Sequence, residues 1–499
     1  MKKKKTLIIV LIAAALLVGV MLLLIFLPKG GESADSATLD EGAKIRTATD
    51  KNGVHQVVVA TEPNGEIKNN SYGTLIEYTP AQIKSIHVEN QKGTLDVEAN
   101  TPKGEATVYT LKGYEDFSLQ SGIPDQVASA AASMKFTQVA SASGDKPEEY
   151  GLDKPRATVT VTYTDKTKSV FTVGNDAPQS AGTYVQFGTE KTVYLCDGEA
   201  VKSFDLGLTD FMDLNINKAA ENDENGAASS ITLTGEAYGG TVKLVPNDDG
   251  KNSASYKITE PDEAYANISE SSNIEGGIRG LLADTVELVN PSAEQLKKVG
   301  LDHPYAKVTA VYPDVTVKLS GTKPNSSGTV YLMADGGKLV YTISADKVAW
   351  ADSSYERLQS EYVLNPTMTA LTGVKFTADK DYDFALETKV STATDNEGSE
   401  TSTTETTVHY GDEEIPVGDF TNLYDDISLI KSAKLTSKSF SGKPGLKVVY
   451  TFSDGSSDTV EFYPADGQNY TAVLNGKAVS SCYGADVTRV INDVKKLTK

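Results

Sequence analysis

The chain is short of the residues on which most catalytic and metal sites depend. Its 499 residues include two cysteines, four histidines and one tryptophan. Two cysteines, Cys196 and Cys482, are too few for a disulfide framework or a cysteine-rich metal site. We expect two inert thiols, with a disulfide between them as the alternative. The small disulfide-stapled class of protein is therefore excluded.

The few histidines offer no metal site. They are scattered along the chain, and none has another histidine at the spacing of metal ligands. The four positions are His55, His87, His303 and His409. A lone histidine in a loop is usually solvent-facing or capping, so we expect no metal and no cofactor.

One acidic stretch, at Asp379, Asp381 and Asp383, begins like a calcium loop. Phe384 and Val390 occupy the positions that require glycine and glutamate, so the pattern fails as a calcium site. Alternating carboxylates of this kind are typical of the solvated face of a strand.

Positive charge is also scarce. Lys and Arg number 47 against 68 Asp and Glu, which gives a net charge of -21. Four of the lysines lie together at residues 2–5, so the rest of the chain is more acidic still. Binding to DNA or RNA requires clustered positive charge, and we expect no nucleic-acid partner.

Nucleotide-binding and hydrolase signatures are missing from the sequence. No glycine-rich phosphate loop follows a strand and opens a helix, and no Gly-x-Ser-x-Gly elbow is present. The chain is therefore not the ATPase of a transporter, and we expect no catalytic residue and no enzyme. A carboxylate pair for glycoside hydrolysis stays open, because the spacing of such a pair is spatial.

An unbroken apolar run at residues 7–27 is the first feature that the sequence does have. About 20 apolar residues span a bilayer, and lysines before such a segment keep the N-terminus in the cytoplasm. We expect a cytoplasmic tail at residues 1–6, an uncleaved signal-anchor helix at 7–27 and a flexible stalk at 28–53. Cleavage near Ser33 and Ala34 is the alternative. The bulk of a single-pass membrane protein would then be extracytoplasmic.

A Gly-Leu-Asp-x-Pro motif occurs twice, each time before an alternating Val- and Thr-rich run. Its residues are Gly151, Leu152, Asp153 and Pro155 in one copy and Gly300, Leu301, Asp302 and Pro304 in the other. Glycine can adopt positive φ at a turn exit, leucine can fill the core, aspartate can close an Asx turn, and proline fixes the entry to a strand. We interpret the motif as structural, with a binding role for the two aspartates as the alternative. A more diverged third copy begins at Gly442.

The same order of elements surrounds each copy, so we predict three tandem repeats at residues 54–212, 227–365 and 366–499. Each is expected to be a strand-rich α+β unit, an antiparallel sheet with one covering helix. The helices are predicted at 127–134, 274–282 and 420–427, with Asp125, Asn273 and Asp419 as N-caps. A strand should follow each helix, at 135–139, 285–289 and 433–437. Residues 395–407, rich in Thr, Ser and Glu, predict an exposed hairpin tip.

Several segments resemble the bacterial domain-of-unknown-function family 4340. They are residues 79–86, 149–159, 171–176 and 192–195, with the helix near 127–134 between them. The resemblance is good over 79–206, fair over 228–350 and weak after Met368. It implies one N-terminal transmembrane helix and a gene often placed beside those of ABC-type export permeases and gliding-type auxiliary subunits. It implies no catalytic residues.

We therefore predict a non-enzymatic, membrane-anchored extracytoplasmic accessory or binding subunit of an ABC-type export complex. Its partners would be the bilayer, through residues 7–27, and the permease and ATPase subunits. A free-standing surface adhesion or envelope-binding protein is the alternative, and an unrecognised envelope hydrolase is a third and less favoured one.

Overall fold

The computed structural model describes most of the chain after the expected stalk. The described residues are 46–58, 73–102, 105–222, 225–394, 400–435, 439–465 and 468–499. Within these ranges no helix is both long and apolar enough to cross a bilayer. The expected anchor at 7–27 lies outside them. The chain divides into two compact units, one of residues 1–112 and 125–205 and the other of 113–124 and 206–499.

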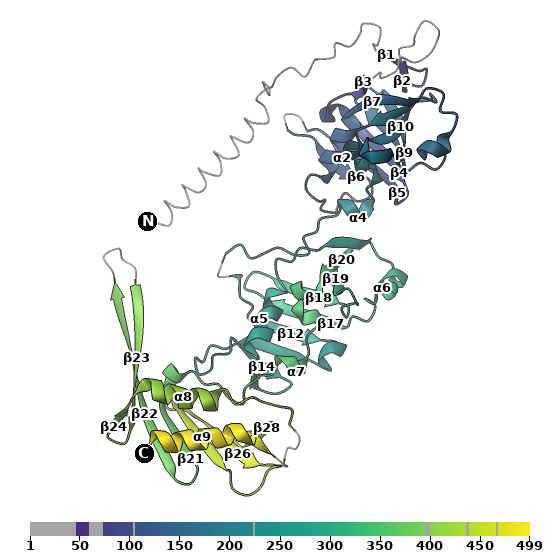
Figure 1. Ribbon diagram of the computed structural model, residues 1–499. Helices are drawn as coiled ribbons and strands as arrows, with labels where there is room; N and C mark the ends of the chain where they lie inside the picture. Colours follow the sequence, from purple (N-terminus) through teal and green to yellow (C-terminus); the bar gives the residue numbers. More distant parts are fainter. Residues whose placement is uncertain are drawn as a thin grey trace. The chain divides into compact units, whose positions relative to one another are not determined.

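The first unit contains a nine-stranded antiparallel sheet with the order β3-β7-β11-β10-β9-β8-β4-β5-β6 (Figure 1). Its strands are β3 (Gly73–Glu77), β4 (Ile83–Asn90), β5 (Gly93–Asn100), β6 (Val108–Leu111), β7 (Ser133–Ser141), β8 (Ala157–Tyr163), β9 (Lys168–Asp176), β10 (Thr183–Phe187) and β11 (Val193–Cys196). Every second residue of β8 is buried, which is the period of a strand with one face on a core. Helix α2 (Ile123–Ala132) leads into β7, and α3 (Gly198–Lys202) follows β11.

A separate two-stranded ribbon precedes this sheet. It pairs β1 (Arg46–Thr49) with β2 (His55–Val58). The last residues of the expected stalk therefore form a strand, which corrects the prediction of a flexible segment up to residue 53. The pattern was missed because a strand of four residues gives too few alternations to detect.

The second unit begins with another nine-stranded sheet, ordered β15-β14-β13-β12-β17-β18-β19-β20-β16. Its strands are β12 (Ser230–Thr234), β13 (Val242–Pro246), β14 (Tyr256–Glu260), β15 (Ala264–Tyr265), β16 (Thr285–Val289), β17 (Ala306–Val311), β18 (Thr316–Gly321), β19 (Thr329–Ala334) and β20 (Leu339–Ser344). Its helices include α4 (Leu208–Phe211), α5 (Ile268–Gly276), α6 (Ala293–Val299) and α7 (Tyr355–Leu358). The single tryptophan, Trp350, is fully buried in its core and donates from Nε1 to the carbonyl of Gly277 at 2.6 Å.

The third sheet has eight strands, in the order β24-β23-β22-β21-β25-β26-β27-β28. They are β21 (Leu371–Thr377), β22 (Asp381–Thr394), β23 (Glu400–Tyr410), β24 (Glu413–Ile415), β25 (Leu446–Phe452), β26 (Ser457–Pro464), β27 (Asn469–Leu474) and β28 (Lys477–Tyr483). Helices α8 (Val417–Ser428) and α9 (Gly484–Leu497) lie side by side over the sheet (Figure 1). Phe420 of α8 and Val490 of α9 are fully buried beneath them.

All three sheets share a central strand order and differ at their edges, and this common centre confirms the prediction of tandem strand-rich α+β repeats. In each, a strand of the first half (β4, β12 or β21) pairs with the first strand of a four-stranded meander (β8–β11, β17–β20 or β25–β28). A helix (α2, α5 or α8) lies in the chain between the two halves. In the first two sheets a strand after that helix, β7 or β16, pairs with the last meander strand.

The helix boundaries correct the predicted caps. Helix α5 is capped by Asn267, whose side chain accepts the N–H of Glu270 at 3.0 Å, and Asn273 lies inside the helix. Asp125 and Asp419 stand in the first turns of α2 and α8, inside the helices rather than before them. The helix dipole favours a carboxylate in the first turn as well as at the cap, so the residue type alone did not fix the start.

Two further differences concern elements that the pattern missed or overstated. Helices α6 and α9 were not predicted, although α9 buries Val487, Val490 and Val494 at helical spacing. The strand expected at 433–437 is reduced to one bridge between Ala433 and Ser481, and residues 436 and 437 lie outside the described part.

Candidate functional site

The two copies of the Gly-Leu-Asp-x-Pro motif lie in different sheets, each before the first strand of a meander. Gly151 comes directly after a short 3-10 helix, and its own φ is 70°. Gly300 comes directly after α6, and its φ is 82°. Both adopt the left-handed conformation that the motif predicted. A Cβ atom at Gly151 would also stand 2.4 Å from the side chain of Asn175. Gly442 repeats the conformation in the third sheet, with φ of 87°.

The other motif residues are divided between core and surface. Leu301 is buried and Leu152 half-buried, whereas Asp153 and Asp302 are exposed. Pro155 and Pro304 are half-buried just before β8 and β17. Asp302 makes its side-chain contact with its neighbour His303, whose Nδ1 lies 3.0 Å from Oδ2. These positions build a turn within each sheet, and they are not gathered around one cavity.

Two histidines of the first unit have specific polar partners. His55 Nε2 lies 2.9 Å from the hydroxyl of Tyr78, whose ring stacks on Tyr163 with centroids 3.6 Å apart. His87 Nδ1 lies 2.7 Å from a carboxylate oxygen of Asp96, and this contact raises the pKa of the imidazole. Across the described ranges, no cluster of three or more His, Cys, Asp or Glu side chains is arranged to hold a metal ion.

The two cysteines are free and buried, so the alternative of a disulfide between them is wrong. Burial raises the pKa of the Cys482 thiol to about 12 and that of Cys196 further. A thiol with so high a pKa is not ionised near neutral pH and is a poor nucleophile.

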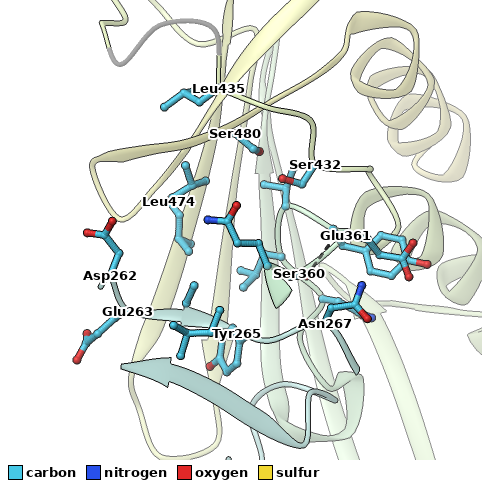
Figure 2. Close-up of a pocket in the computed structure, with 18 of the residues that line it drawn as sticks. Asp262, Glu263, Tyr265, Asn267, Ser360, Glu361, Ser432, Leu435, Leu474 and Ser480 are labelled. Carbon is cyan, nitrogen blue, oxygen red and sulfur yellow. Dashed lines mark hydrogen bonds between the residues drawn. The ribbon is translucent and has the colours of Figure 1, made fainter. Parts of the chain in front are cut away.

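A large groove in the second unit, between the second and third sheets, is the strongest candidate for a binding site. It has a volume of about 1080 Å³. The β14–β15 turn lines it on one side and strand β28 on another, while linker residues 359–365 complete it. Figure 2 shows Asp262, Glu263 and Tyr265 below the space and Leu435, Leu474 and Ser480 above it. Histidine and cysteine are absent from its lining.

The groove carries more negative than positive charge. Its carboxylates are Asp262, Glu263, Glu270, Glu356, Glu361 and Asp458, and its cations are Lys257, Arg357, Lys434 and Lys477. Three of the cations are already engaged in ion pairs: Lys257 with Asp249, Arg357 with Glu270 and Lys477 with Asp262. The lining therefore favours a ligand that brings positive charge.

One carboxylate of the groove, that of Glu270, is fixed by hydrogen bonds from neighbouring side chains. Glu270, near the start of α5, is buried and accepts from Arg357 Nη2 at 3.0 Å and from the hydroxyl of Ser353. Arg357 also donates to the carbonyl of Asp352. A buried carboxylate is retained only when it is paired and hydrogen-bonded, and here both oxygens have partners.

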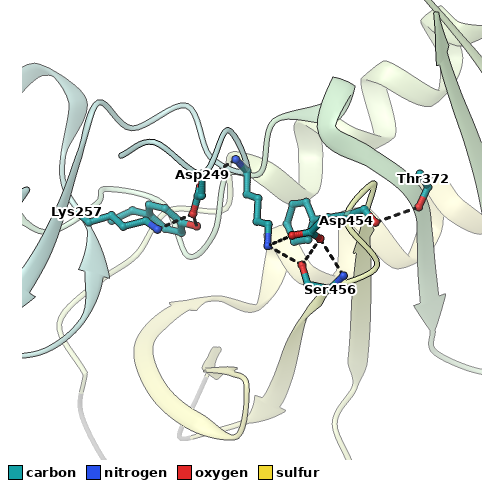
Figure 3. A network of polar contacts seen from close by, with 8 residues as sticks. Asp249, Lys257, Thr372, Asp454 and Ser456 are labelled. Carbon is teal, nitrogen blue, oxygen red and sulfur yellow. Dashed lines mark hydrogen bonds and ion pairs between the residues drawn. The ribbon is translucent and has the colours of Figure 1, made fainter. Parts of the chain in front are cut away.

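A polar network fixes the second sheet to the third beside the groove (Figure 3). Lys251 Nζ lies 2.7 Å from Asp454 Oδ2, donates to Ser456 Oγ at 2.6 Å and stands over the ring of Phe452. Hydrogen bonds from Lys251 and from Ser456 hold the pKa of Asp454 far below the ordinary range. Tyr265 also packs against the third core. The groove is therefore formed by two sheets that contact each other directly.

Sequence reasoning did not find this groove. Its residues come from four stretches of the chain, 252–270, 355–365, 432–435 and 458–480, and none of them carries a recognised motif. The only usable signal was the weak alternation of residues 477–480, which marks a strand but does not show what lies beside it.

Comparison with protein families supports the repeat organisation. The family model described as "Domain of unknown function (DUF4340)" matches residues 110–286 and, overlapping these, 257–410. The two matches together cover more than half of the chain. The chain belongs to this family. No curated protein and no solved structure is significantly similar to it.

The family matches are offset from the sheets. The first match starts in β6 of the first sheet and ends in β16 of the second, and the other ends in β23 of the third. The family unit thus joins the meander of one sheet to the first half of the next. It starts later than the resemblance over 79–206 and stops before α8, so the meander of the third sheet is not matched.

Proposed function

We propose that this family member is a non-enzymatic extracytoplasmic accessory subunit of an ABC-type export complex, anchored in the membrane by residues 7–27. Family membership carries the proposal, because the family resemblance implies such a setting. The four lysines before the apolar run support an orientation with the three sheets outside the cytoplasm, by the positive-inside rule. Energy coupling would come from another subunit.

The candidate groove supports a binding role over a catalytic one. Three of its four cations are committed to ion pairs within the protein, and Glu270 has partners on both oxygens. A general acid or base needs a titratable group poised for exchange with substrate. The groove instead offers polar and charged contacts from several stretches of the chain, which suits recognition of a protein segment.

Co-purification tests the proposal directly. The full chain is tagged at its C-terminus, extracted from its native membrane in mild detergent after gentle cross-linking, and analysed by mass spectrometry. We expect a multispanning permease and a cytoplasmic ATPase in stoichiometric amounts. A chain that brings down neither subunit would contradict the transport proposal and favour a free-standing surface protein.

Two chimaeras locate the determinant of the complex. In one, an unrelated spanning helix replaces residues 7–27, and we expect the complex to persist because this run has no strongly polar residue and one glycine, Gly19, for specific helix pairing. In the other, the anchor is kept and an unrelated soluble domain replaces everything from residue 46 onward, and we expect the complex to be lost. The opposite pair of results would assign specificity to the anchor.

A further inference from the structure

The outer face of the second sheet carries lysines and no carboxylate on its four central strands, β13, β12, β17 and β18. Every second residue of these strands is buried in the core, so the alternate residues form the opposite, solvent-facing side. These outer residues are threonine, serine, valine and three lysines, Lys243, Lys307 and Lys318. In a chain with a net charge of -21, this face is locally positive.

The register of the strands sets the lysines close together. Lys243 pairs with Thr232 of β12, which pairs on its other side with Thr309 of β17. Thr309 in turn pairs with Lys318 of β18. Neighbouring strands lie about 4.8 Å apart, so Lys243 and Lys318 end a row about 14 Å long that has two threonines at its centre. Lys307 precedes Thr309 on the same face of β17 and, like Lys318, is exposed.

The equivalent positions of the other two sheets do not share this charge. Lys243 stands at the place in the register where the first sheet has Asp96 and the third has Asp383. Lys318 replaces an uncharged residue of both. Its Nζ lies 3.9 Å from Oδ2 of Asp335, and such an exposed pair is weak. The positive face is therefore a feature of the second repeat and not of the shared fold.

The third sheet has a lysine at the position of Lys307, but there the lysine is paired. Lys447 Nζ lies 3.5 Å from Oε1 of Glu461 on the neighbouring strand. In the second sheet Ser320 takes the position of Glu461, opposite Lys307. The same lysine thus faces a carboxylate in one repeat and a hydroxyl in the other.

Two exposed valines lie at one end of the lysine-bearing face. Val311 of β17 is 37% exposed, and Val315, in the turn to β18, is 42% exposed. The other two sheets have threonine, Thr162 and Thr451, at the position of Val311. The face therefore offers apolar contact beside its positive charge.

We propose that this lysine face, made of Lys243, Lys307, Lys318 and the two valines, binds an acidic segment of a partner protein that carries an apolar residue. The carboxylates of the segment face the lysines, and its apolar side chain contacts Val311. Complementary charge selects the partner and speeds its association. The acidic remainder of the chain repels such a segment, which restricts it to this face.

A short acidic peptide is the probe for this site. The labelled peptide of about ten residues has four aspartates and one leucine among serines and glycines. It is titrated into the full chain in mild detergent, with binding followed by fluorescence anisotropy. We expect saturable binding that weakens with added salt, because salt screens exposed charges. Asparagine in place of the aspartates should weaken binding at least tenfold, and serine in place of the leucine should weaken it severalfold.

Lysine acylation, followed by mass spectrometry, locates the contact. Saturating peptide should slow the acylation of Lys307 and Lys318, which are exposed in the free chain. Lys447, at the equivalent position of the third sheet, should keep its rate and serves as the internal control.

Matched variants of the chain test the same contact. Lys307→Glu combined with Lys318→Glu reverses two charges of the lysine face and should lower the affinity for the aspartate peptide at least tenfold. Lys375→Glu combined with Lys447→Glu changes the net charge by the same amount on the outer face of the third sheet and should leave the affinity unchanged. Because the altered peptides leave the protein untouched, their results stand even if a variant fails to fold.

Several results would overturn the inference. Absence of saturable binding at millimolar peptide, equal binding of the asparagine peptide, or unchanged acylation of Lys307 and Lys318 would each contradict it. Equal binding of the serine peptide would show that the face takes a simple polyanion and not a protein segment. Protection of these lysines without peptide would assign the face to the membrane if it required anionic lipid in nanodiscs, or to a second copy if it rose with protein concentration.

This inference does not depend on the transport proposal, since it concerns the chemistry of the bound segment and not the identity of the protein that carries it. None of the outcomes above bears on co-purification with a permease, so the two proposals fail separately.

Discussion

The second and third sheets share a central strand order but differ at the edge of the meander. In the second, β16 covers that edge and the buried Trp350 fills the core behind it. In the third, the described residues show one bridge at the matching edge, between Ala433 and Ser481, and helix α9 packs beside α8 over the core. The comparison shows that the third repeat adds a helix to the cover of its core, whereas the second adds a buried tryptophan.

Truncation of Trp350 should have the largest effect, a loss of stability of the second sheet. Trp350→Ala deletes a fully buried ring and its hydrogen bond to Gly277, and should cost about 3–5 kcal/mol of unfolding free energy. Denaturant unfolding followed by circular dichroism, with hydrogen exchange resolved by sheet, measures the loss. Exchange in the third sheet should change much less, because its core is separate. An equal loss in both sheets would mean that they unfold as one unit.

Truncation in α9 is the converse experiment on the third sheet. Val490→Ala removes two buried methyl groups and should cost about 2 kcal/mol. Faster exchange should appear in α8, α9 and β25–β28, while the fluorescence of Trp350 should keep its wild-type denaturation midpoint. A neutral result would show that α9 is not required to close the third core.

The turn glycines provide a matched pair of smaller effects. Gly300→Val and Gly442→Val each place a β-branched residue at positive φ, with no severe clash nearby. Each should cost about 1–3 kcal/mol from backbone strain alone. Similar losses in the two sheets, measured by local hydrogen exchange, would show that the diverged third motif keeps the structural role of the second. A loss confined to Gly300→Val would show that it does not.

Acid should weaken the contact between the second and third sheets. This is the smallest of the expected effects. Because Lys251 lowers the folded pKa of Asp454, this ion pair contributes fully above the ordinary carboxyl pKa. The contribution is lost progressively as the pH falls below that value toward the folded pKa. We expect amide exchange near Ser456 and Asn252, corrected for intrinsic rates, to rise below about pH 4. Asp454→Asn should remove this pH dependence, whereas Asp335→Asn, on an exposed turn of the second sheet, should retain it.

Strand-rich repeats were predictable because their signal is local. Alternation in β8, β17 and β25 follows from one buried face, and the glycines at 151 and 300 mark turns that require positive φ. Helix starts were less predictable, because Asp125 and Asp419 suit a first turn as well as a cap. The candidate groove was not predictable, since its walls come from separate segments of two sheets.

The sequence by itself determined the repeat and the acidic charge, because short-range periodicity and composition set these properties. Only the tertiary structure decided which edges are paired. Strand β20 pairs with β16, whereas the described residues show a single bridge at the matching edge of β28, between Ala433 and Ser481. Edge pairing depends on where a distant segment of the chain lies. The alternation of a strand's residues indicates which face is buried, but it does not indicate which strand pairs with its edge.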